Sequence, residues 1–438
     1  MVTVLVIGAG AREHALAQAF ANSAQVTMVY VAPGNVGMQA DTIQPVGIPM
    51  TDIDALRDFA TMTAIDLTFV GSEEPLIAGI VDEFQAAGLP IFGPTKAAAQ
   101  LEGSKSFAKD RLAAAGIPTA TSVTVASWPA AERAIMTSEE PVVVKQDGLA
   151  AGKGVTIYAT RQEALTAVHG LYQVDNQTKL VIEAYLRGVE FSIFSLVGPN
   201  GIVHTPVAQD HKRLLDGDLG PNTGGMGAYS PVRWLADEVV ADAIDQLVGP
   251  LLTEMVANHT PFTGVLYTGV MLTAQGPKVI EYNVRFGDPE TQVVLPQLES
   301  DFYELVLALV RGQQPVAQWQ TEDVYLGVVL AAPGYPVAPV QGMMVPTISM
   351  PKIRSFYAGV GQNDDKLITS GGRVATIVAT APSATKAQAQ VYSVLDALPV
   401  KLHYRHDIGY QAVEKENKVV SGDANRYWNC TSRRSVAH

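Results

Sequence analysis

The sequence predicts a multidomain protein that combines α/β and α+β domains. The chain has 438 residues, of which 47% are hydrophobic and 17% charged, so it is long and apolar enough for several buried cores. A strand, a glycine turn and a helix open the chain, which is typical of a doubly wound domain. From about residue 322, short strands surround one helix, which indicates a smaller α+β domain at the C-terminal end.

Residues 1–100 are predicted to form the doubly wound domain. The apolar run 2–7 reads as a buried parallel strand, and further strands are expected at 26–31, 67–70 and 91–92, with helices at 13–20 and from 76 onward.

The glycine turn at 8–10 does not predict a dinucleotide site. Glu13 stands where a third glycine is required, and no acidic residue follows the next strand, so NAD binding is not expected. The turn and Arg12, at a helix N-terminus, could still hold a phosphate. The alternative is that the glycines only permit close packing of strand and helix.

A helix is expected to begin at the Leu101-Glu102-Gly103-Ser104-Lys105 stretch and to end near 115–116. Beyond it, a strand at 142–145 ends in Lys145, and a glycine-rich loop leads to a second strand at 155–158. A strand, not a helix, follows the glycines, so the loop is not a P-loop. With Lys153 near its tip, it is interpreted as a lid over phosphates, or alternatively as a mobile surface hairpin.

Two further stretches are typical of ligand sites. The 179–190 stretch reads as two strands joined by a short crossing, whose backbone could meet an adenine edge while Glu190 holds ribose hydroxyls. The 210–227 stretch is rich in glycine and aperiodic, so it is predicted to be a long functional loop whose N–H groups and Lys212 bind an anion. Solvated strand ends and a disordered surface loop are the respective alternatives.

The strongest local pattern lies at 281–290. A strand at 266–272 is expected to pair with a strand that carries Glu281 and Asn283 on one face, because side chains alternate along a strand. A carboxylate and an amide oxygen so placed suit a hard cation such as Mg²⁺. Arg285 adds a planar cation that suits a carboxylate or phosphate. The alternative is an edge strand with solvated polar residues.

Charge and cysteine content exclude several classes of function. The net charge of −13 argues against a general binder of nucleic acid or membrane surfaces. Cys430 is the only cysteine, so no disulfide framework or thiolate metal site is expected. No run has the composition of a signal peptide or the length of a membrane helix, and a cytoplasmic location is expected.

Taken together, the motifs resemble the phosphoribosylamine–glycine ligase family of ATP-grasp enzymes, over about residues 1–413. The stretches that carry the resemblance are 8–16, 101–105, 145–154, 209–213, 220–231 and 281–290. Ser72, Pro333 and His406 depart from the family pattern, and none of them is an expected ligand. The resemblance implies a central ATP-grasp domain at 101–320, with a lid subdomain at about 119–188. A C-terminal α+β domain at 322–413 and a polar tail at 414–438 are expected to follow.

The resemblance also implies the reaction and its residues. ATP, glycine and 5-phosphoribosylamine would give glycinamide ribonucleotide, ADP and phosphate through a glycyl phosphate, with Mg²⁺ or Mn²⁺ held by Glu281 and Asn283. Expected nucleotide-binding residues are Lys105, Lys145, Gly152, Gly154, Glu183, Leu186 and Glu190. The expected catalytic residues are Lys153, Asp210, Lys212 and Arg285. The last three would hold glycine and the acyl phosphate, together with the loop residues Asn222, Thr223, Gly224, Gly225 and Met226. Expected at the phosphoribosyl end are Gly10, Arg12, Glu13, Asp288 and Glu290.

Two rival functions remain open at this point. One keeps the ATP-grasp fold but activates bicarbonate instead of glycine. The other is a nucleotide-binding regulator without catalysis, against which the complete set of lysines and metal ligands argues. The expected partners are small molecules only, without nucleic acid or membrane, and the expected assembly is a monomer or weak homodimer.

Overall fold

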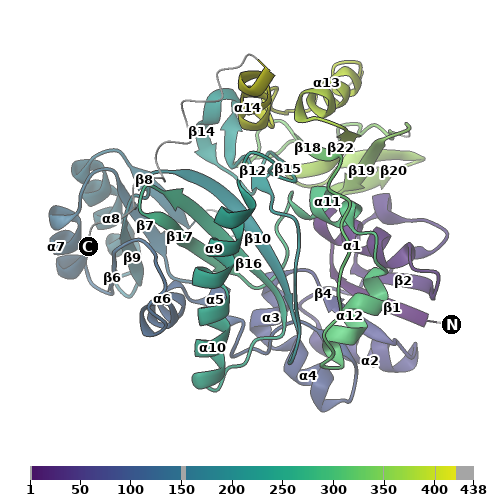
Figure 1. The fold of residues 1–438 in the computed structure, drawn as a ribbon, viewed down its shortest axis with the longest axis horizontal. Coiled ribbons are helices and arrows are strands. Elements are labelled where there is room, and N and C mark those ends of the chain that lie inside the picture. The colour runs from purple at the N-terminus through teal and green to yellow at the C-terminus, as the bar shows by residue number, and fades with distance from the viewer. Residues whose placement is uncertain (1, 149–153, 349, 400, 421–438) are drawn as a thin grey trace, which may run out of the picture.

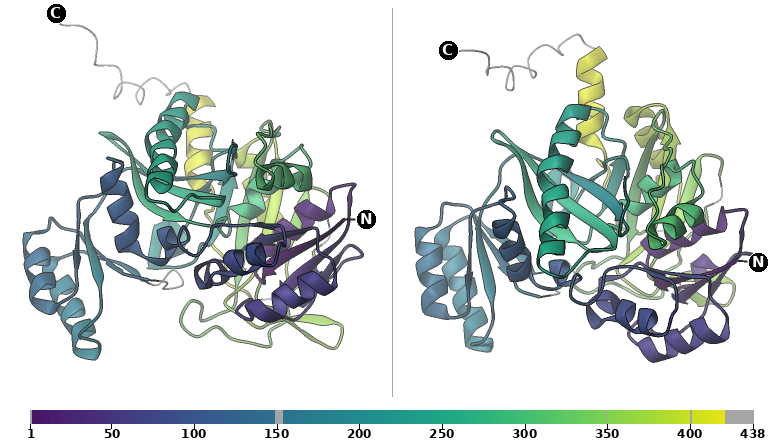
Figure 2. Two further views of the ribbon diagram at one scale, coloured as in Figure 1. Left: turned by 90° about the horizontal axis from the view of Figure 1, so that it is seen from below. Right: turned by 60° about the horizontal axis from the view of Figure 1, so that its bottom comes forward.

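The structure is a computed structural model that describes residues 2–148, 154–348, 350–399 and 401–420. Figures 1 and 2 show an N-terminal layer of parallel strands, a central antiparallel sheet, a small unit that projects to one side, and a C-terminal sheet. The prediction of combined α/β and α+β domains is confirmed.

The N-terminal sheet is parallel, with the strand order β3-β2-β1-β4-β5. Residues 4–7 of β1 are fully buried, as a parallel strand covered on both faces requires. Its strands are β1 (Val2–Gly8), β2 (Val26–Pro33), β3 (Ile43–Pro45), β4 (Leu67–Val70) and β5 (Ile91–Phe92). Its helices are α1 (Ala11–Ala21), η1 (Val36–Met38), α2 (Ile53–Met62), α3 (Glu73–Ala78) and α4 (Ile80–Ala86).

Glu13 explains why the opening turn departs from the dinucleotide pattern. The Gly10 N–H donates to its carboxylate at 2.7 Å, so the side chain folds back over the turn. A Cβ on Gly8, where φ is +137°, would lie 2.4 Å from Glu13 Cγ. The acid therefore fills the space that a third glycine would leave open, and only glycine fits at position 8.

The helix predicted from residue 101 is two helices, α5 (Gln100–Gly103) and α6 (Lys105–Ala114). Ser104 is extended, and its hydroxyl accepts a hydrogen bond from the Phe107 N–H at 3.2 Å. Such an N-cap satisfies an otherwise free backbone donor and starts a new helix. The break places Lys105 in the first turn of α6.

A small unit with its own apolar core follows. Its antiparallel sheet has the order β6-β9-β7-β8, and Figure 2 shows it standing apart from the other sheets. The elements are β6 (Ser122–Val125), α7 (Trp128–Thr137), β7 (Val142–Gln146), β8 (Val155–Tyr158), α8 (Arg161–Val174) and β9 (Leu180–Ala184). The predicted pairing of the strands at 142–145 and 155–158 is confirmed, because β7 and β8 form an antiparallel hairpin.

The central sheet carries the E-x-N motif. Its order is β11-β10-β16-β17, and β16 pairs with β17 as predicted, with Gly269 opposite Glu281. The strands are β10 (Val189–Val197), β11 (Ile202–His204), β16 (Gly264–Thr273) and β17 (Gly276–Asn283). Neighbouring helices are α9 (Asp237–Leu247), α10 (Gly249–Ala257), α11 (Thr291–Val294), η3 (Leu295–Gln297) and α12 (Phe302–Val310).

The third sheet, ordered β12-β15-β18-β22-β19, continues across the domain boundary expected near residue 322. Two of its strands, β12 (Gln209–Asp210) and β15 (Gly227–Ser230), precede that position. The later elements are β18 (Val324–Ala331), β19 (Ile353–Tyr357), β20 (Val360–Asn363), β21 (Lys366–Thr369), β22 (Arg373–Ala381) and α13 (Ala384–Leu395).

The prediction of a structureless loop at 210–227 is wrong. Between β12 and β15 lies a two-stranded hairpin of β13 (Arg213–Leu215) and β14 (Leu219–Asn222), joined by η2 (Asp216–Asp218). Arg405, whose side chain is fully buried, holds the hairpin by ion pairs of 2.8 Å to Asp218 and to Asp407. Asp218 lies 187 residues before Arg405 in the chain, so local periodicity gives no sign of this contact.

The expectation of a loose tail from residue 414 is wrong up to residue 420. Helix α14 (Tyr410–Val420) continues through this part of the chain. The Glu416 carboxylate accepts hydrogen bonds from the Ala384 N–H at 2.7 Å and from the Thr385 N–H at 3.0 Å. It thereby satisfies free donors in the first turn of α13.

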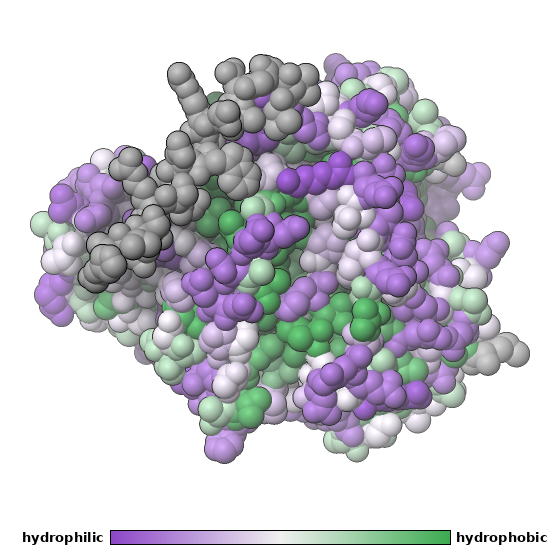
Figure 3. Space-filling view, viewed as in Figure 1, coloured by the Kyte–Doolittle hydropathy of each residue, from purple (hydrophilic) through white to green (hydrophobic). Residues whose placement is uncertain are grey.

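Polar residues cover much of the face shown in Figure 3, with apolar residues gathered in a band near its centre. Across the described ranges, no helix combines the length and the apolar character that crossing a membrane requires.

Candidate active site

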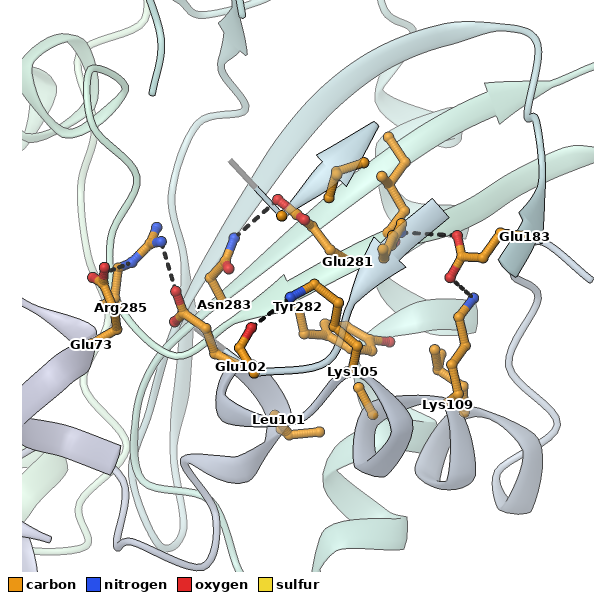
Figure 4. Close-up of a pocket in the computed structure, with 17 residues that line it drawn as sticks. Glu73, Leu101, Glu102, Lys105, Lys109, Glu183, Glu281, Tyr282, Asn283 and Arg285 are labelled. Atoms are coloured by element: carbon orange, nitrogen blue, oxygen red, sulfur yellow. Dashed lines mark hydrogen bonds and ion pairs between the residues drawn. The ribbon is translucent and has the colours of Figure 1, made fainter. Parts of the chain in front are cut away.

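One pocket gathers residues from the N-terminal layer, the α5–α6 pair, the projecting unit and the central sheet (Figure 4). The residues that line it are Glu73, Leu101, Glu102, Lys105, Ala108, Lys109, Leu112, Lys145, Gly148, Gly154, Val155, Glu183, Ile280, Glu281, Tyr282, Asn283 and Arg285. The structure thus brings Lys105, Lys145 and Glu281 together, as the sequence predicted. Their roles as ligands stay predictions.

Glu281 and Asn283 lie side by side at the end of β17. The Asn283 amide nitrogen lies 3.4 Å from Glu281 Oε1, so the two side chains share one face of the strand. Burial raises the pKa of Glu281, but the charges of Lys212 and Lys145 outweigh burial, and the net shift is downward. A carboxylate that stays ionised beside an amide suits a hard divalent cation.

Two protein side chains with oxygen atoms suit a cation that is also held by the phosphates of a nucleotide. No three His, Cys, Asp or Glu side chains gather into a metal cage in the part of the chain that the structure describes. Mg²⁺ in nucleotide sites commonly takes one or two protein oxygens and completes its shell with phosphates and water. Glu281 and Asn283 fit that pattern.

The two predicted phosphate-binding lysines reach the pocket from different elements. Lys105 Nζ donates to the Gly148 carbonyl at 2.8 Å and so holds the start of the glycine-rich loop. Lys145 Nζ donates to the Ile280 carbonyl at 3.0 Å, next to Glu281 on β17. Burial lowers the pKa of Lys105. Both lysines line the same pocket as Glu281.

Glu183 is not a solvated strand end. Only 5% of its side chain is exposed, and its two oxygens each lie 2.9 Å from a lysine, Lys145 on one side and Lys109 on the other. Lys109 was not predicted. The spacing could have predicted it, because Lys109 lies four residues after Lys105 on α6, and side chains four residues apart share one face of a helix.

Arg285 lies beyond the end of β17, so strand alternation does not place it. Its guanidinium is held between two carboxylates, with Glu102 at 2.7 Å and Glu73 at 3.2 Å (Figure 4). The sequence analysis missed both acids as site residues. Burial lowers the pKa of Arg285, but the charges of Glu102 and Glu73 outweigh it and give a net rise. Arg285 thus links the N-terminal layer, α5 and the metal-site strand.

The Glu73 contact predicts an acid-sensitive stability. Burial raises the pKa of Glu73, but Arg285 and Arg12 outweigh it and lower the pKa from 4.5 to about 2. The stability from this ion pair is then fully present above about pH 4.5 and is lost as the pH falls toward about 2. We expect Glu73→Gln to lower the free energy of unfolding by about 1–2 kcal/mol at pH 6, since a quarter of the side chain is exposed.

Urea unfolding of the wild type and Glu73→Gln at pH 6 and pH 3.5 measures this. The difference between the two proteins should shrink at the lower pH, whereas the exposed neighbour variant Glu74→Gln should show little effect at either pH. An equal difference at both pH values would contradict the assigned pKa.

Lys212 lies between two carboxylates in a second group of charged side chains, close to Glu281. Its ammonium contacts the carboxylate of Glu190 and lies 3.4 Å from Asp210. Burial raises the pKa of Glu190, while Asp210 and Glu190 outweigh burial and raise that of Lys212. The charge of Lys212 also acts on Glu281. The predicted residues Asp210, Lys212 and Glu190 therefore do come together beside Glu281.

The glycine-rich segment after β14 is fixed by its own backbone. Both the N–H and the hydroxyl of Thr223 donate to the Lys212 carbonyl, at 2.8 and 2.9 Å. The Met226 N–H donates to the His211 carbonyl at 2.8 Å. Gly225 has φ +117° and packs so closely on Pro289 that a Cβ there would lie 2.4 Å from Pro289 Cδ. Only glycine fits at position 225.

Arg373 contacts two predicted site residues and was not itself predicted, because the C-terminal region was expected to carry no chemical motif. From the start of β22 it donates to the Gly224 carbonyl at 2.8 Å and to the Asp288 carbonyl at 2.6 Å. Its guanidinium also lies 2.9 Å from the Asp288 carboxylate. A lone arginine at a strand start gives no sequence signal for such contacts.

The residues expected at the phosphoribosyl end are only partly gathered. Gly10 lies near Asp288, since a Cβ on it would be 3.6 Å from Asp288 Oδ2. Glu290 is buried and accepts a hydrogen bond from the Ser192 hydroxyl at 3.3 Å, and burial together with Asp210 raises its pKa to about 7.

Arg12 is engaged by the protein. Its guanidinium donates to Glu13 at 2.6 Å, to Ser72 Oγ at 3.1 Å and to the Phe286 carbonyl at 3.2 Å. Arg12 therefore ties the opening turn to the 285–287 segment. The phosphate contact expected for it stays a prediction.

The remaining predicted nucleotide-binding residues, and Lys153, have different outcomes. Leu186 lies in the crossing between β9 and β10 and is absent from the pocket lining given above. Gly154 lines the pocket. Gly152 and Lys153 lie outside the described residues.

Family comparisons match nearly the whole chain. Models of the phosphoribosylglycinamide synthetase N domain, ATP-grasp (A) domain and C domain match residues 2–102, 103–291 and 325–411. A phosphoribosylamine–glycine ligase of Lactococcus lactis subsp. lactis is 48% identical over 94% of this chain and 100% of its own length. One from Halalkalibacterium halodurans is 45% identical over 94% of this chain and 97% of its own.

Solved structures agree with this. The crystal structure of a phosphoribosylamine–glycine ligase from Thermotoga maritima has a TM-score of 0.80 and 33% identity, covering 93% of this chain and all of its own. A biotin carboxylase from Campylobacter jejuni, bound to an ATP analogue, has a TM-score of 0.71 at 15% identity, with 96% of each chain covered. The second likeness concerns the fold alone.

Proposed function

The chain belongs to the phosphoribosylamine–glycine ligase family, also called phosphoribosylglycinamide synthetase, and from this premise we propose how its residues divide the reaction. The protein is an ATP-dependent ligase that joins glycine to 5-phosphoribosylamine, giving glycinamide ribonucleotide, ADP and phosphate in de novo purine biosynthesis. Like ATP-grasp enzymes in general, it uses ATP together with a divalent metal ion.

The first step activates the glycine carboxylate. A carboxylate oxygen of glycine takes the γ-phosphoryl group of ATP, so that a glycyl phosphate forms and ADP leaves. The protein contributes positioning and charge compensation to such a transfer, since no protein group bonds to phosphorus. Lys105 and Lys145 are proposed to hold the phosphates from the side of α6 and β7. Arg285 and Lys212 are proposed to hold the glycine carboxylate and the transferred group.

Glu281 and Asn283 would hold Mg²⁺ or Mn²⁺ against the phosphates. Bound there, the ion supplies Lewis-acid compensation of phosphate charge and a template for the transfer. The adjacent carboxylate and amide oxygens, and the ionised state of Glu281, support this assignment.

The second step forms the C–N bond. The amine nitrogen of 5-phosphoribosylamine attacks the carbonyl carbon of glycyl phosphate, the C–O bond to phosphate breaks, and the amine loses a proton. Glycyl phosphate hydrolyses if water reaches it, so the loop at 148–154, which includes Gly152, Lys153 and Gly154, is proposed to close over the site.

The substrates are proposed to bind in neighbouring parts of the site around Glu281 and Asn283, since Lys212 contacts Glu190. The crossing segment with Glu183, Leu186 and Glu190 would receive adenine and ribose. Asp210 and the 222–226 segment would place glycine, and Gly10, Arg12, Glu13, Asp288 and Glu290 would receive the phosphoribosyl group. Arg373 supports this arrangement, because it joins Gly224 to Asp288.

The observation that carries the proposal is the single pocket that unites Lys105, Lys145, Glu281, Asn283 and Arg285. We expect purified protein with ATP and Mg²⁺ to release ADP when both glycine and 5-phosphoribosylamine are present, and to release far less when either is omitted. A coupled ADP assay measures this. ADP release with bicarbonate in place of glycine would overturn the assignment of the acid.

We also propose a monomer or weak homodimer in the cytoplasm, acting on small molecules without nucleic acid or membrane partners. The net charge of −13 supports the absence of nucleic-acid and membrane partners, because nucleic acid and anionic membranes attract basic surfaces. Sedimentation at several protein concentrations tests the assembly, and a concentration-independent dimer would contradict it.

A further inference from the structure

Two lysines surround the buried carboxylate of Glu183, although one would be enough to balance its charge. Lys145 Nζ and Lys109 Nζ each lie 2.9 Å from it, and all three residues line the pocket. Figure 4 shows Glu183 beside Lys109. The exposed fractions are 5% for Glu183, 7% for Lys145 and 13% for Lys109. One lysine would balance the carboxylate. The second lysine gives this part of the pocket wall a surplus of one positive charge.

The two lysines are anchored differently. Lys109 Nζ donates to Thr119 Oγ1 at 2.9 Å and to the Ala120 carbonyl at 3.4 Å. These two hydrogen bonds, together with the ion pair to Glu183 at 2.9 Å, hold Lys109 against the pocket wall. Thr119 in turn donates to the Val279 carbonyl at 2.8 Å and so ties this wall to β17.

Lys145 has a donor to spare. Within the described residues its Nζ has two partners, the Ile280 carbonyl and Glu183. An ammonium has three donors, so one is free for a ligand in the pocket. Lys145 therefore contacts the strand that presents Glu281 directly, whereas Lys109 reaches that strand only through Thr119.

We propose that Lys109 is a positioning residue for nucleotide binding, which compensates the charge of Glu183 so that Lys145 can offer its charge to the phosphates. This inference rests on the proposed function only in that ATP binds in this pocket. Without Lys109, Glu183 Oε1 would lose its ion-pair partner, and only Lys145 would balance the carboxylate. Lys145 would then be drawn to both carboxylate oxygens, and the pair as a whole would be neutral.

Nucleotide binding tests this directly. Lys109→Met removes the charge at nearly constant side-chain length, and Lys109→Arg keeps it. Affinities for the non-hydrolysable ATP analogue AMPPNP with Mg²⁺ are measured by calorimetry, and affinities for adenosine, which has no phosphates, by ligand-observed NMR. We expect Lys109→Met to weaken AMPPNP binding about tenfold more than adenosine binding. Lys109→Arg should stay within about threefold of the wild type for both ligands.

Lys386→Met is the matched control. It makes the same charge change at an exposed position of α13, away from the pocket, and should leave both affinities within about twofold. Wild-type AMPPNP affinity in Lys109→Met, or an equal loss for adenosine, would overturn the proposal. If thermal unfolding shows that Lys109→Met does not fold, Lys109→Arg decides, because a folded arginine variant with a tenfold loss for AMPPNP alone would reject the charge argument.

The two proposals fail separately. If the wild type binds AMPPNP but does not ligate glycine, the proposed function is wrong while the ratio of AMPPNP to adenosine affinities still judges Lys109. If the wild type ligates glycine and Lys109→Met keeps the wild-type ratio, the role of Lys109 is wrong and the function stands.

Discussion

Glu281→Ala should lower ligase turnover by about 1,000-fold or more while the protein remains folded. The carboxylate is the charged member of the proposed cation site, and the neighbouring amide of Asn283 cannot replace its charge. The fold should survive because nearby cations keep other partners, namely Glu183 for Lys145 and Glu190 for Lys212. The measurement is coupled ADP release at saturating glycine and 5-phosphoribosylamine, together with a thermal unfolding curve.

A second readout separates metal binding from general damage. In the wild type, the affinity for AMPPNP should rise with Mg²⁺ concentration, and in Glu281→Ala this dependence should largely disappear. Glu132→Ala, an exposed change on α7, serves as the control and should behave as the wild type does. Full turnover in Glu281→Ala would show that the metal assignment is wrong.

Arg285→Met should reduce both activity and stability. We expect turnover to fall about 1,000-fold, because a cation proposed to hold the reacting carboxylate and phosphoryl group is lost. The free energy of unfolding should fall by about 2–4 kcal/mol, since Glu102 and Glu73 lose the guanidinium that lies between them. Urea unfolding at pH 7 measures the second effect.

The double variant Arg285→Met/Glu102→Gln distinguishes the two effects. Burial raises the pKa of Glu102 to about 7, and replacing this carboxyl by an amide removes the cost of burying it without Arg285. The double variant should therefore regain part of the stability but none of the activity. If stability and activity returned together, Arg285 would be a structural residue only.

Local patterns in the sequence predicted the buried strands well, but they missed the short strands β13 and β14 and the break between α5 and α6. The continuous apolar runs at β4 and β5 gave their bounds, because strands buried on both faces need such runs. The break between α5 and α6 was missed, since one extended serine that caps the second helix looks like any other helical residue in a short window.

The candidate site was predictable where its residues are close in sequence. Glu281 and Asn283 follow from strand alternation, and family resemblance added Lys105 and Lys145. The contacts missed were Arg285 with Glu102, 183 residues apart, and Arg373 with Asp288, 85 residues apart. Such pairs depend on how whole sheets and helices pack, and a periodic pattern within one element carries no information about them.

The sheet that joins β15 to β18 bears on how this enzyme could be re-engineered. A hybrid in which the final third came from a distant relative would have to rebuild the ladder between those strands residue by residue. It would also have to supply a guanidinium at position 373 for the Gly224 carbonyl. Recombination points inside this sheet are therefore poor choices, and crossovers are better placed at the outer connections of the projecting β6–β9 unit.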